Sequence, residues 1–213
     1  MNILILGATG RTGRHIAQYA VENGHKVIAI IRDKAKALIP GVRFIEGSSS
    51  DYDLLNKVLK GVDAVIVALN ISRTSDNPFA RIISPLTLIS DTVMTLMPAM
   101  ERNGVKRIIT ISASGVGDSW NDMPFFSKWL VRNSNVWHAY KDHDRQERIL
   151  RNLNLDWTIA RPVLLNNKDS DQYTAVIGKP DGGGISRKGV ARFIIDILES
   201  GKFEKDCVTL FSK

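Results

Sequence analysis

A glycine-rich junction near the N-terminus constrains the fold of this chain more than any other feature. The largely apolar run 2–6 leads directly into GATGRTG (residues 7–13), and a helical pattern follows at once. The apolar run predicts a buried strand, while Ile16, Tyr19 and Ala20 share one face of a helix. Three glycines between a strand and a helix indicate a tight turn that leaves the backbone at the helix N-terminus accessible.

Apolar runs and helical patterns alternate through the first two-thirds of the chain. Strands are predicted at 2–6, 26–31, 43–45, 64–69, 107–111, 157–161 and 207–211. Helices are predicted at 12–23, 52–59, 85–102, 138–151 and 185–200. Such alternation implies right-handed crossovers and helices on both faces of a mostly parallel sheet. We therefore expect an α/β fold with a Rossmann-type, doubly wound sheet and a small C-terminal lobe.

The totals restrict the class of protein. A length of 213 residues suits one domain, 1–213, with a substrate lobe formed mainly by 115–140 and 163–185. No apolar run is long enough to span a membrane. We expect no signal peptide, because the N-terminus has no basic region and its short apolar run ends in glycines. A single cysteine, Cys207, excludes an intramolecular disulfide, and the histidine spacing indicates no metal site. We expect a cytoplasmic monomer or homodimer that binds a small molecule.

The net charge of +7 raises the question of nucleic acid. The basic residues are spread along the chain and form no nucleic-acid-binding motif, so this class of partner is disfavoured. A basic field equally suits an anionic ligand such as a dinucleotide phosphate.

The glycine junction predicts a dinucleotide site because a strand precedes it and a helix follows it. Gly7 permits the turn, Gly10 lets the backbone approach a pyrophosphate, and Gly13 allows the helix to pack against the sheet. Thr9 and Thr12 add hydroxyl donors. The alternative is a tight strand-to-helix turn that binds no ligand.

Arg32 indicates which dinucleotide is bound. NAD-binding turns place an acidic residue at the end of the second strand, whereas an arginine there suits the 2′-phosphate of NADP. The strand 26–31 ends at Arg32, and Arg11 can reach the same phosphate. We therefore favour NADP(H) over NAD(H). The alternative is that both arginines are solvated surface residues.

Five motifs carry a family resemblance: GATGRTG, VIAIIRD (27–33), DAVIV (63–67), GVKRI (104–108) and LDWTIARP (155–162). On these motifs the chain resembles the atypical short-chain dehydrogenase/reductases. Within them it is most similar to the NAD(P)H-binding proteins of the flavin reductase/biliverdin-IXβ reductase and NmrA-like group. The resemblance covers nearly the whole chain in order.

The resemblance implies a set of cofactor contacts. The pyrophosphate and ribose fall to Gly7, Thr9, Gly10, Arg11, Thr12 and Gly13. Arg32 holds the 2′-phosphate, and Ser48 takes the place of an acidic residue beside the adenine. Leu69, Asn70 and Ser112 lie near the nicotinamide and its ribose, with Pro162 also among the cofactor contacts.

The chain departs from the family where the catalytic Tyr-x-x-x-Lys is usually found. Counting back from residues 155–158, those two positions fall on Ala139 and His143, so the usual proton relay is missing. Tyr140 is one residue out of place, about 100° around an ideal helix. The candidate catalytic residues are therefore Ser112, His143 and Tyr140. The alternative for His143 is an ordinary polar residue on a solvated helix face.

Aromatic residues gather at 120–130, together with Trp137, directly after a predicted strand. They predict either a lid and wall for a flat conjugated substrate, such as an isoalloxazine or quinone, or a small helical lobe with its own core. The glycine-rich segment 181–184 predicts either a loop that closes the site or a simple turn.

Three functions follow from these patterns. The first is an NADPH-dependent oxidoreductase that transfers hydride to a flat conjugated acceptor such as a flavin or quinone. The second is a non-catalytic, NmrA-like regulator that senses NADP. The third is an NADP-dependent epimerase or dehydratase, which ranks last because such enzymes generally need the tyrosine.

Overall fold

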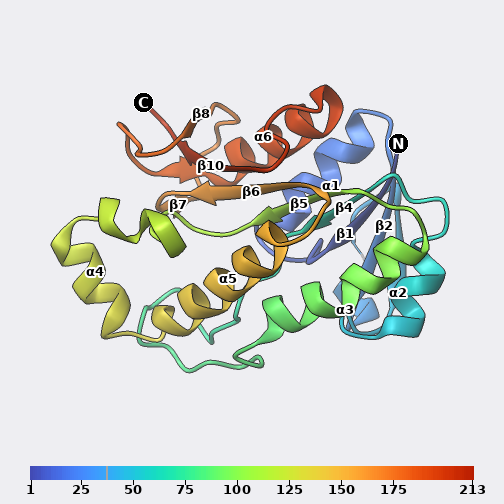
Figure 1. Cartoon of the computed structure of the whole chain (residues 1–213), viewed down its shortest axis with the longest axis horizontal. Coiled ribbons are helices and arrows are strands. Elements are labelled where there is room, and N and C mark those ends of the chain that lie inside the picture. The colour runs from blue at the N-terminus through green and yellow to red at the C-terminus, as the bar shows by residue number, and fades with distance from the viewer. Residues whose placement is uncertain (37) are drawn as a thin grey trace.

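The computed structural model describes residues 1–36 and 38–213 and is built around an eight-stranded sheet (Figure 1). The strand order is β3-β2-β1-β4-β5-β6-β10-β8. The bounds are β1 (Asn2–Leu6), β2 (Lys26–Ile31), β3 (Val42–Glu46), β4 (Ala64–Val67), β5 (Arg107–Ile111), β6 (Asp156–Pro162), β8 (Thr174–Ile177) and β10 (Asp206–Phe211). All neighbours pair in parallel except β10 and β8. The predicted Rossmann-type, mostly parallel sheet is confirmed.

Helices cover both faces of this sheet. On one face lie α1 (Gly13–Glu22) and α6 (Arg187–Ser200), which contact each other. On the other face lie α2 (Tyr52–Val58), α3 (Leu88–Arg102) and α5 (Val136–Arg151) (Figure 1). A 3-10 turn, η2 (Gly117–Asp122), and helix α4 (Phe125–Arg132) lie between β5 and α5 in the chain. No helix of the described residues is long and apolar enough to cross a membrane.

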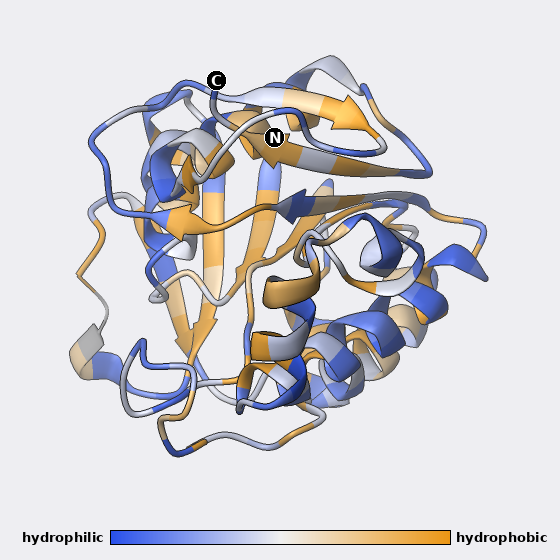
Figure 2. Ribbon diagram, turned by 90° about the vertical axis from the view of Figure 1, so that its left-hand side faces the viewer, coloured by the Kyte–Doolittle hydropathy of each residue, from blue (hydrophilic) through white to orange (hydrophobic). Residues whose placement is uncertain are grey.

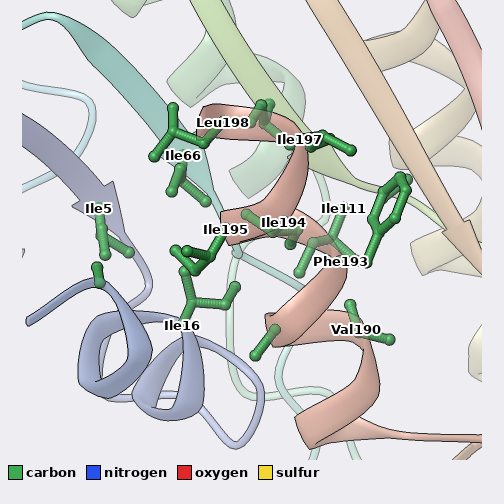
Figure 3. Close-up of a cluster of buried hydrophobic side chains, with 14 of the residues drawn as sticks. Ile5, Ile16, Ile66, Ile111, Val190, Phe193, Ile194, Ile195, Ile197 and Leu198 are labelled. Atoms are coloured by element: carbon green, nitrogen blue, oxygen red, sulfur yellow. The ribbon is translucent and has the colours of Figure 1, made fainter. Parts of the chain in front are cut away.

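Two apolar layers hold the helices to the sheet. The first joins α1 and α6 to the strands, and Figure 3 shows Ile16 and Ile195 gathered beside Ile5 and Ile66. The second packs α2, α3 and α5 on the opposite face. All four residues of β4 are buried, so this strand has no solvated face. Figure 2 shows the apolar strands enclosed between the more polar helices.

Several predicted boundaries are wrong. The strand expected at 64–69 ends at Val67, and the helix expected at 85–102 begins at Leu88. The helix expected from residue 185 begins at Arg187, because Ile185–Ser186 forms β9 and pairs with β7 (Leu165–Asn166). Ser186 caps α6 by accepting a bond from the backbone N–H of Gly189.

The topology brings the candidate site to one edge of the sheet. From β1 the chain moves outward to β2 and β3, and it then returns to β4 on the other side of β1. The crevice between β1 and β4 is therefore the switch point at which parallel sheets bind ligands. In the pairing of β4 with β5, Val67 lies opposite Thr110, so the loops that begin with Leu69 and Ser112 leave the sheet side by side.

Candidate functional site

The glycines of the first turn have different packing constraints. A side chain on Gly7 would meet the Ala68 carbonyl oxygen at 2.6 Å, in a backbone with φ of +91°. A side chain on Gly13 would lie 2.0 Å from the Gly7 carbonyl oxygen. On Gly10 the added carbon would have one neighbour within 4 Å, the same Gly7 carbonyl oxygen, at 3.1 Å. Gly7 and Gly13 are therefore required for packing, whereas Gly10 borders open space.

Backbone donors face that open space. The N–H of Gly10 donates to Gly7, and the N–H of Arg14 donates to Gly10. Within residues 1–36 and 38–213, the N–H groups of Arg11, Thr12 and Gly13 have no protein acceptor. Free donors at a helix N-terminus attract anions through both hydrogen bonding and the helix dipole. The residues of this turn therefore fit a pyrophosphate.

The two arginines predicted to bind phosphate face different surroundings. Arg32 follows β2 and is exposed, so its side chain is available to a ligand. Arg11 is engaged: its guanidinium pairs with Asp76 in the loop after β4. This hydrogen bond lowers the pKa of Asp76 below its ordinary value. Only one nitrogen of the Arg11 guanidinium bonds Asp76, so its other N–H donors are available to a phosphate.

The remaining predicted cofactor residues lie along the same edge of the sheet. Leu69 is half-buried, and the exposed Asn70 accepts a bond from the N–H of Ile71. The hydroxyl of the exposed Ser48 accepts a bond from the N–H of Ser50. Pro162 ends β6, and its carbonyl accepts a bond from Ser114. The structure thus brings the ends of β4, β5 and β6 together beside the glycine turn.

Ser112 belongs to a buried polar network that the sequence analysis missed. Its hydroxyl donates to Glu147 Oε1 over 2.6 Å. Glu147 is also paired with Arg161, whose Nε lies 3.0 Å from the same oxygen and whose Nη2 bonds Oε2. The exposed fractions of these three residues are only 2–4%. Burial opposes the charge on Arg161, but the bonds and charge of Glu147 outweigh it and raise the pKa of Arg161.

The network reaches the surface through Asp118. Arg161 Nη2 lies 2.6 Å from Asp118, and Arg151 donates to Asp118 from the other side. Burial alone would raise the pKa of Asp118, but its bonds to the two arginines outweigh burial and lower that pKa. Arg151 Nη2 also lies 3.0 Å from the sulfur of Cys207. Burial raises the pKa of the Cys207 thiol.

The other two candidate catalytic residues lie on α5, where Tyr140 is half-buried and His143 is buried. Tyr140 donates its hydroxyl to the Ser114 carbonyl over 3.0 Å, and burial raises the pKa of Tyr140 to about 12. His143 is 4% exposed, with its Nδ1 3.2 Å from Gln146. Burial lowers the pKa of His143, which keeps the imidazole neutral. The alternative reading of His143, a residue on a solvated face, is wrong.

The neighbours of His143 explain why this charged stretch is buried. Asp142 accepts bonds from the N–H groups of Ile89 and Ser90 at 2.8 and 3.2 Å, and so caps the start of α3. Ala139, where the family tyrosine is expected, packs against Ile71 and Ile89. This side of α5 therefore faces α3 and the loop after β4.

An aromatic pocket of about 450 Å³ opens on another side of α5. Trp120 lies 5.6 Å from Trp137 and 6.3 Å from Tyr140 between ring centroids. Arg132 covers the Trp120 ring at 5.0 Å, and Gly115 to Asp118 line the pocket beside them. In contrast, Phe125 and Phe126 are 84% and 70% exposed and so are not part of a lobe core.

The segment 181–184 packs against the end of β10. Gly183 donates to the Ser212 carbonyl over 3.0 Å. A side chain on Gly182 would lie 2.3 Å from the Phe211 ring. The segment 181–184 therefore packs against, and is hydrogen-bonded to, the end of the C-terminal strand.

Comparison with known proteins agrees with this arrangement. Residues 7–201 match the model of a family described as NAD(P)H-binding, and the chain belongs to that family. It is 25% identical to the photosystem II assembly factor Ycf39 of Synechocystis over 76% of this chain and 44% of that protein. The chain spans from a quarter to less than half of the length of several curated relatives that it matches.

Solved structures share the fold over almost the whole chain. One is ChuY, an anaerobillin reductase from Escherichia coli O157:H7, with a TM-score of 0.81 and 20% identity over 99% of this chain and 97% of that one. Another is a short-chain dehydrogenase/reductase from Veillonella parvula in complex with NADP. Its TM-score is 0.78, with 19% identity over 99% of this chain and 94% of that one.

Proposed function

We propose that this protein is an NADPH-dependent reductase that transfers a hydride to a flat conjugated acceptor, such as a flavin or a quinone. The observation that carries the proposal is the aromatic pocket of Trp120, Trp137 and Tyr140, which begins only three residues after Ser112. The aromatic side chains offer flat walls to a conjugated ring, and charged residues that line the rest of the pocket, such as Lys141 and Asp144, offer polar contacts. The reductase named among the structural neighbours supports the same class of activity.

Each part of the site has a separate task in this proposal. The turn from Gly7 to Gly13, with Thr9 and Thr12, binds the pyrophosphate, and Arg32 binds the 2′-phosphate. Ser48, Leu69, Asn70 and Pro162 line the adenine and nicotinamide ends. When bound, the reduced nicotinamide supplies a hydride. The acceptor gains that hydride and a proton from solvent, so it is reduced by two electrons while the cofactor is oxidised.

Turnover with a panel of acceptors tests this function. NADPH oxidation is followed at steady state with flavins, quinones, biliverdin and aldehydes. We expect turnover with at least one flat conjugated acceptor, and we expect Trp120→Ala to raise its KM because one aromatic wall is lost. Phe126→Ala is the matched control, since Phe126 is 70% exposed outside the pocket. NADPH binding without oxidation by any acceptor would rule out the reductase.

A second function, an NmrA-like regulator that binds NADP without turnover, is favoured by one observation. The hydroxyl protons of Ser112 and Tyr140 are both committed to protein acceptors, and His143 is buried. None of these three residues is poised to give a proton to a ligand. NADPH binding with no turnover in the panel supports this function over the first.

Arg32→Ala tests the preference for NADPH. Removing a charge-assisted contact to the 2′-phosphate is expected to weaken NADPH binding by about 1.5–3 kcal/mol and to leave NADH binding nearly unchanged. Both affinities are measured by titration of nicotinamide fluorescence. Arg43→Ala, an exposed arginine on β3, is the control and should change neither. Equal losses for both cofactors would contradict the assignment of Arg32.

A further inference from the structure

The direction of the Ser112 hydrogen bond is set by its surroundings. A serine hydroxyl has one proton and two lone pairs, so it can donate only one hydrogen bond. The Ser112 proton is directed to Glu147 Oε1, 2.6 Å away, because an ionised carboxylate only accepts. Toward any other neighbour, Ser112 has only lone pairs to offer.

Glu147 is held in this role by Arg161. Arg161 donates to both carboxylate oxygens, and the two side chains are 5% and 3% exposed. Arg151 adds a second positive charge 3.8 Å from Oε2. A guanidinium does not lose its proton in a protein, so it stabilises the charged carboxylate. The buried ion pair therefore keeps the hydroxyl proton of Ser112 directed at Glu147.

We infer that Glu147 is a positioning residue that makes Ser112 a hydrogen-bond acceptor for the ligand, so the site selects a ligand that presents an N–H donor to Ser112. The inference rests on the proposed placement of Ser112 beside the nicotinamide. The N–H group has two possible sources: the carboxamide of the nicotinamide, or a ring N–H of the acceptor. A bare carbonyl or ether oxygen would face lone pairs of Ser112 and be disfavoured.

The nearby hydroxyl of Tyr140 does not reverse this polarity. It donates to the Ser114 carbonyl over 3.0 Å, so it too points its proton at the protein. Two hydroxyls that lie close to the end of β5 thus have no proton left for a ligand. A ligand carbonyl finds neither of these donors, whereas a ligand N–H finds the Ser112 oxygen.

Paired ligands with and without the N–H group test the inference. The first pair is NADPH and its 3-acetylpyridine analogue, in which a methyl ketone replaces the carboxamide and removes its N–H₂. The second pair is riboflavin and 3-methylriboflavin, compared in the presence of NADP⁺. Dissociation constants are measured by fluorescence, so this test needs no turnover. We expect the wild type to prefer the N–H ligand of one pair by about 3- to 10-fold.

The variant Ser112→Ala should remove that preference. It should weaken binding of the N–H ligand and bring the ratio within about twofold. A preference confined to the first pair assigns the N–H to the cofactor, and one confined to the second pair assigns it to the acceptor. The inference is overturned if the wild type shows no preference in either pair, or if Ser112→Ala keeps it.

The variant Glu147→Gln gives a second, directional readout. The glutamine amide can donate to Ser112 and release its proton toward the ligand, so the preference should shift toward the ketone or methylated ligand. Glu101→Gln, an exposed residue at the end of α3, is the control. If the melting curve shows that Glu147→Gln does not fold, the effect of Ser112→Ala on the ligand preference decides whether the inference holds. Absence of NADPH oxidation in the acceptor panel would refute the proposed reductase. It would not affect the ratios of dissociation constants, so the two failures are distinguishable.

Discussion

Arg161→Met is expected to destabilise the protein by about 3–5 kcal/mol, because it leaves the carboxylate of Glu147 buried without its main partner. Arg161 makes two bonds to Glu147 and one to Asp118, and it is 4% exposed. Methionine fills a similar volume, so the loss reports the uncompensated charge more than a cavity. Urea unfolding followed by circular dichroism measures the change.

Two further variants separate charge from packing. Arg161→Met combined with Glu147→Leu removes both charges and should recover much of the lost stability, since apolar replacements of buried ion pairs are often neutral. Arg148→Met removes a surface pair with Asp144, in which Arg148 is 76% exposed, and should change stability by less than about 1 kcal/mol. If Arg161→Met is no more destabilising than Arg148→Met, the buried pair does not support the fold.

The sheet and the glycine turn were predictable from the sequence because both depend on local signals. Apart from Asn2, the residues of β1 and β4 are all apolar, which is typical of short strands buried on both faces. The turn carries three glycines at fixed spacing. Two of these have no room for a side chain, which gives the pattern a direct physical cause.

The buried polar network was not predictable in the same way. Charged residues crowd the segment from Lys141 to Arg148, a composition typical of a solvated helix face. Asp142 and Glu147 are nevertheless buried, because their partners lie in α3, directly after β5 and in β6, all distant in the sequence. One signal was available: Arg161 lies in a largely apolar strand, and a buried arginine needs a hydrogen-bonded partner, of which an acidic side chain is one kind.

The short helix and strands within the predicted lobe segments were not predicted, for a different reason. Strands β7 and β9 have two residues each, and β8 lies at the edge of the sheet, paired with β10. Such short elements carry no period that a sequence window can detect. Helix α4 exposes much of its aromatic surface, including Trp129 at 52%, so its pattern does not indicate a single buried face.

Gly13→Ala is expected to destabilise the protein by about 1–3 kcal/mol. This loss is expected even though alanine is more favourable than glycine in a helix by about 1 kcal/mol. The new methyl group would lie 2.0 Å from the Gly7 carbonyl oxygen and 2.8 Å from its carbon. Both are backbone atoms, so no side chain can rotate away. The first turn of α1 must move off the sheet, and NADPH binding should weaken with it.

Gly10→Ala is the matched comparison because it separates stability from binding. Its methyl group would touch only the Gly7 carbonyl oxygen, at 3.1 Å, and would otherwise enter the open space above the turn. We expect a stability change below about 1 kcal/mol but a clear loss of NADPH affinity. Gly183→Ala, with no atom within 4 Å of the added carbon, should change neither. Unfolding curves and NADPH titrations give both quantities. A Gly10→Ala variant that binds NADPH as the wild type does would show that the space above Gly10 is not where the pyrophosphate lies.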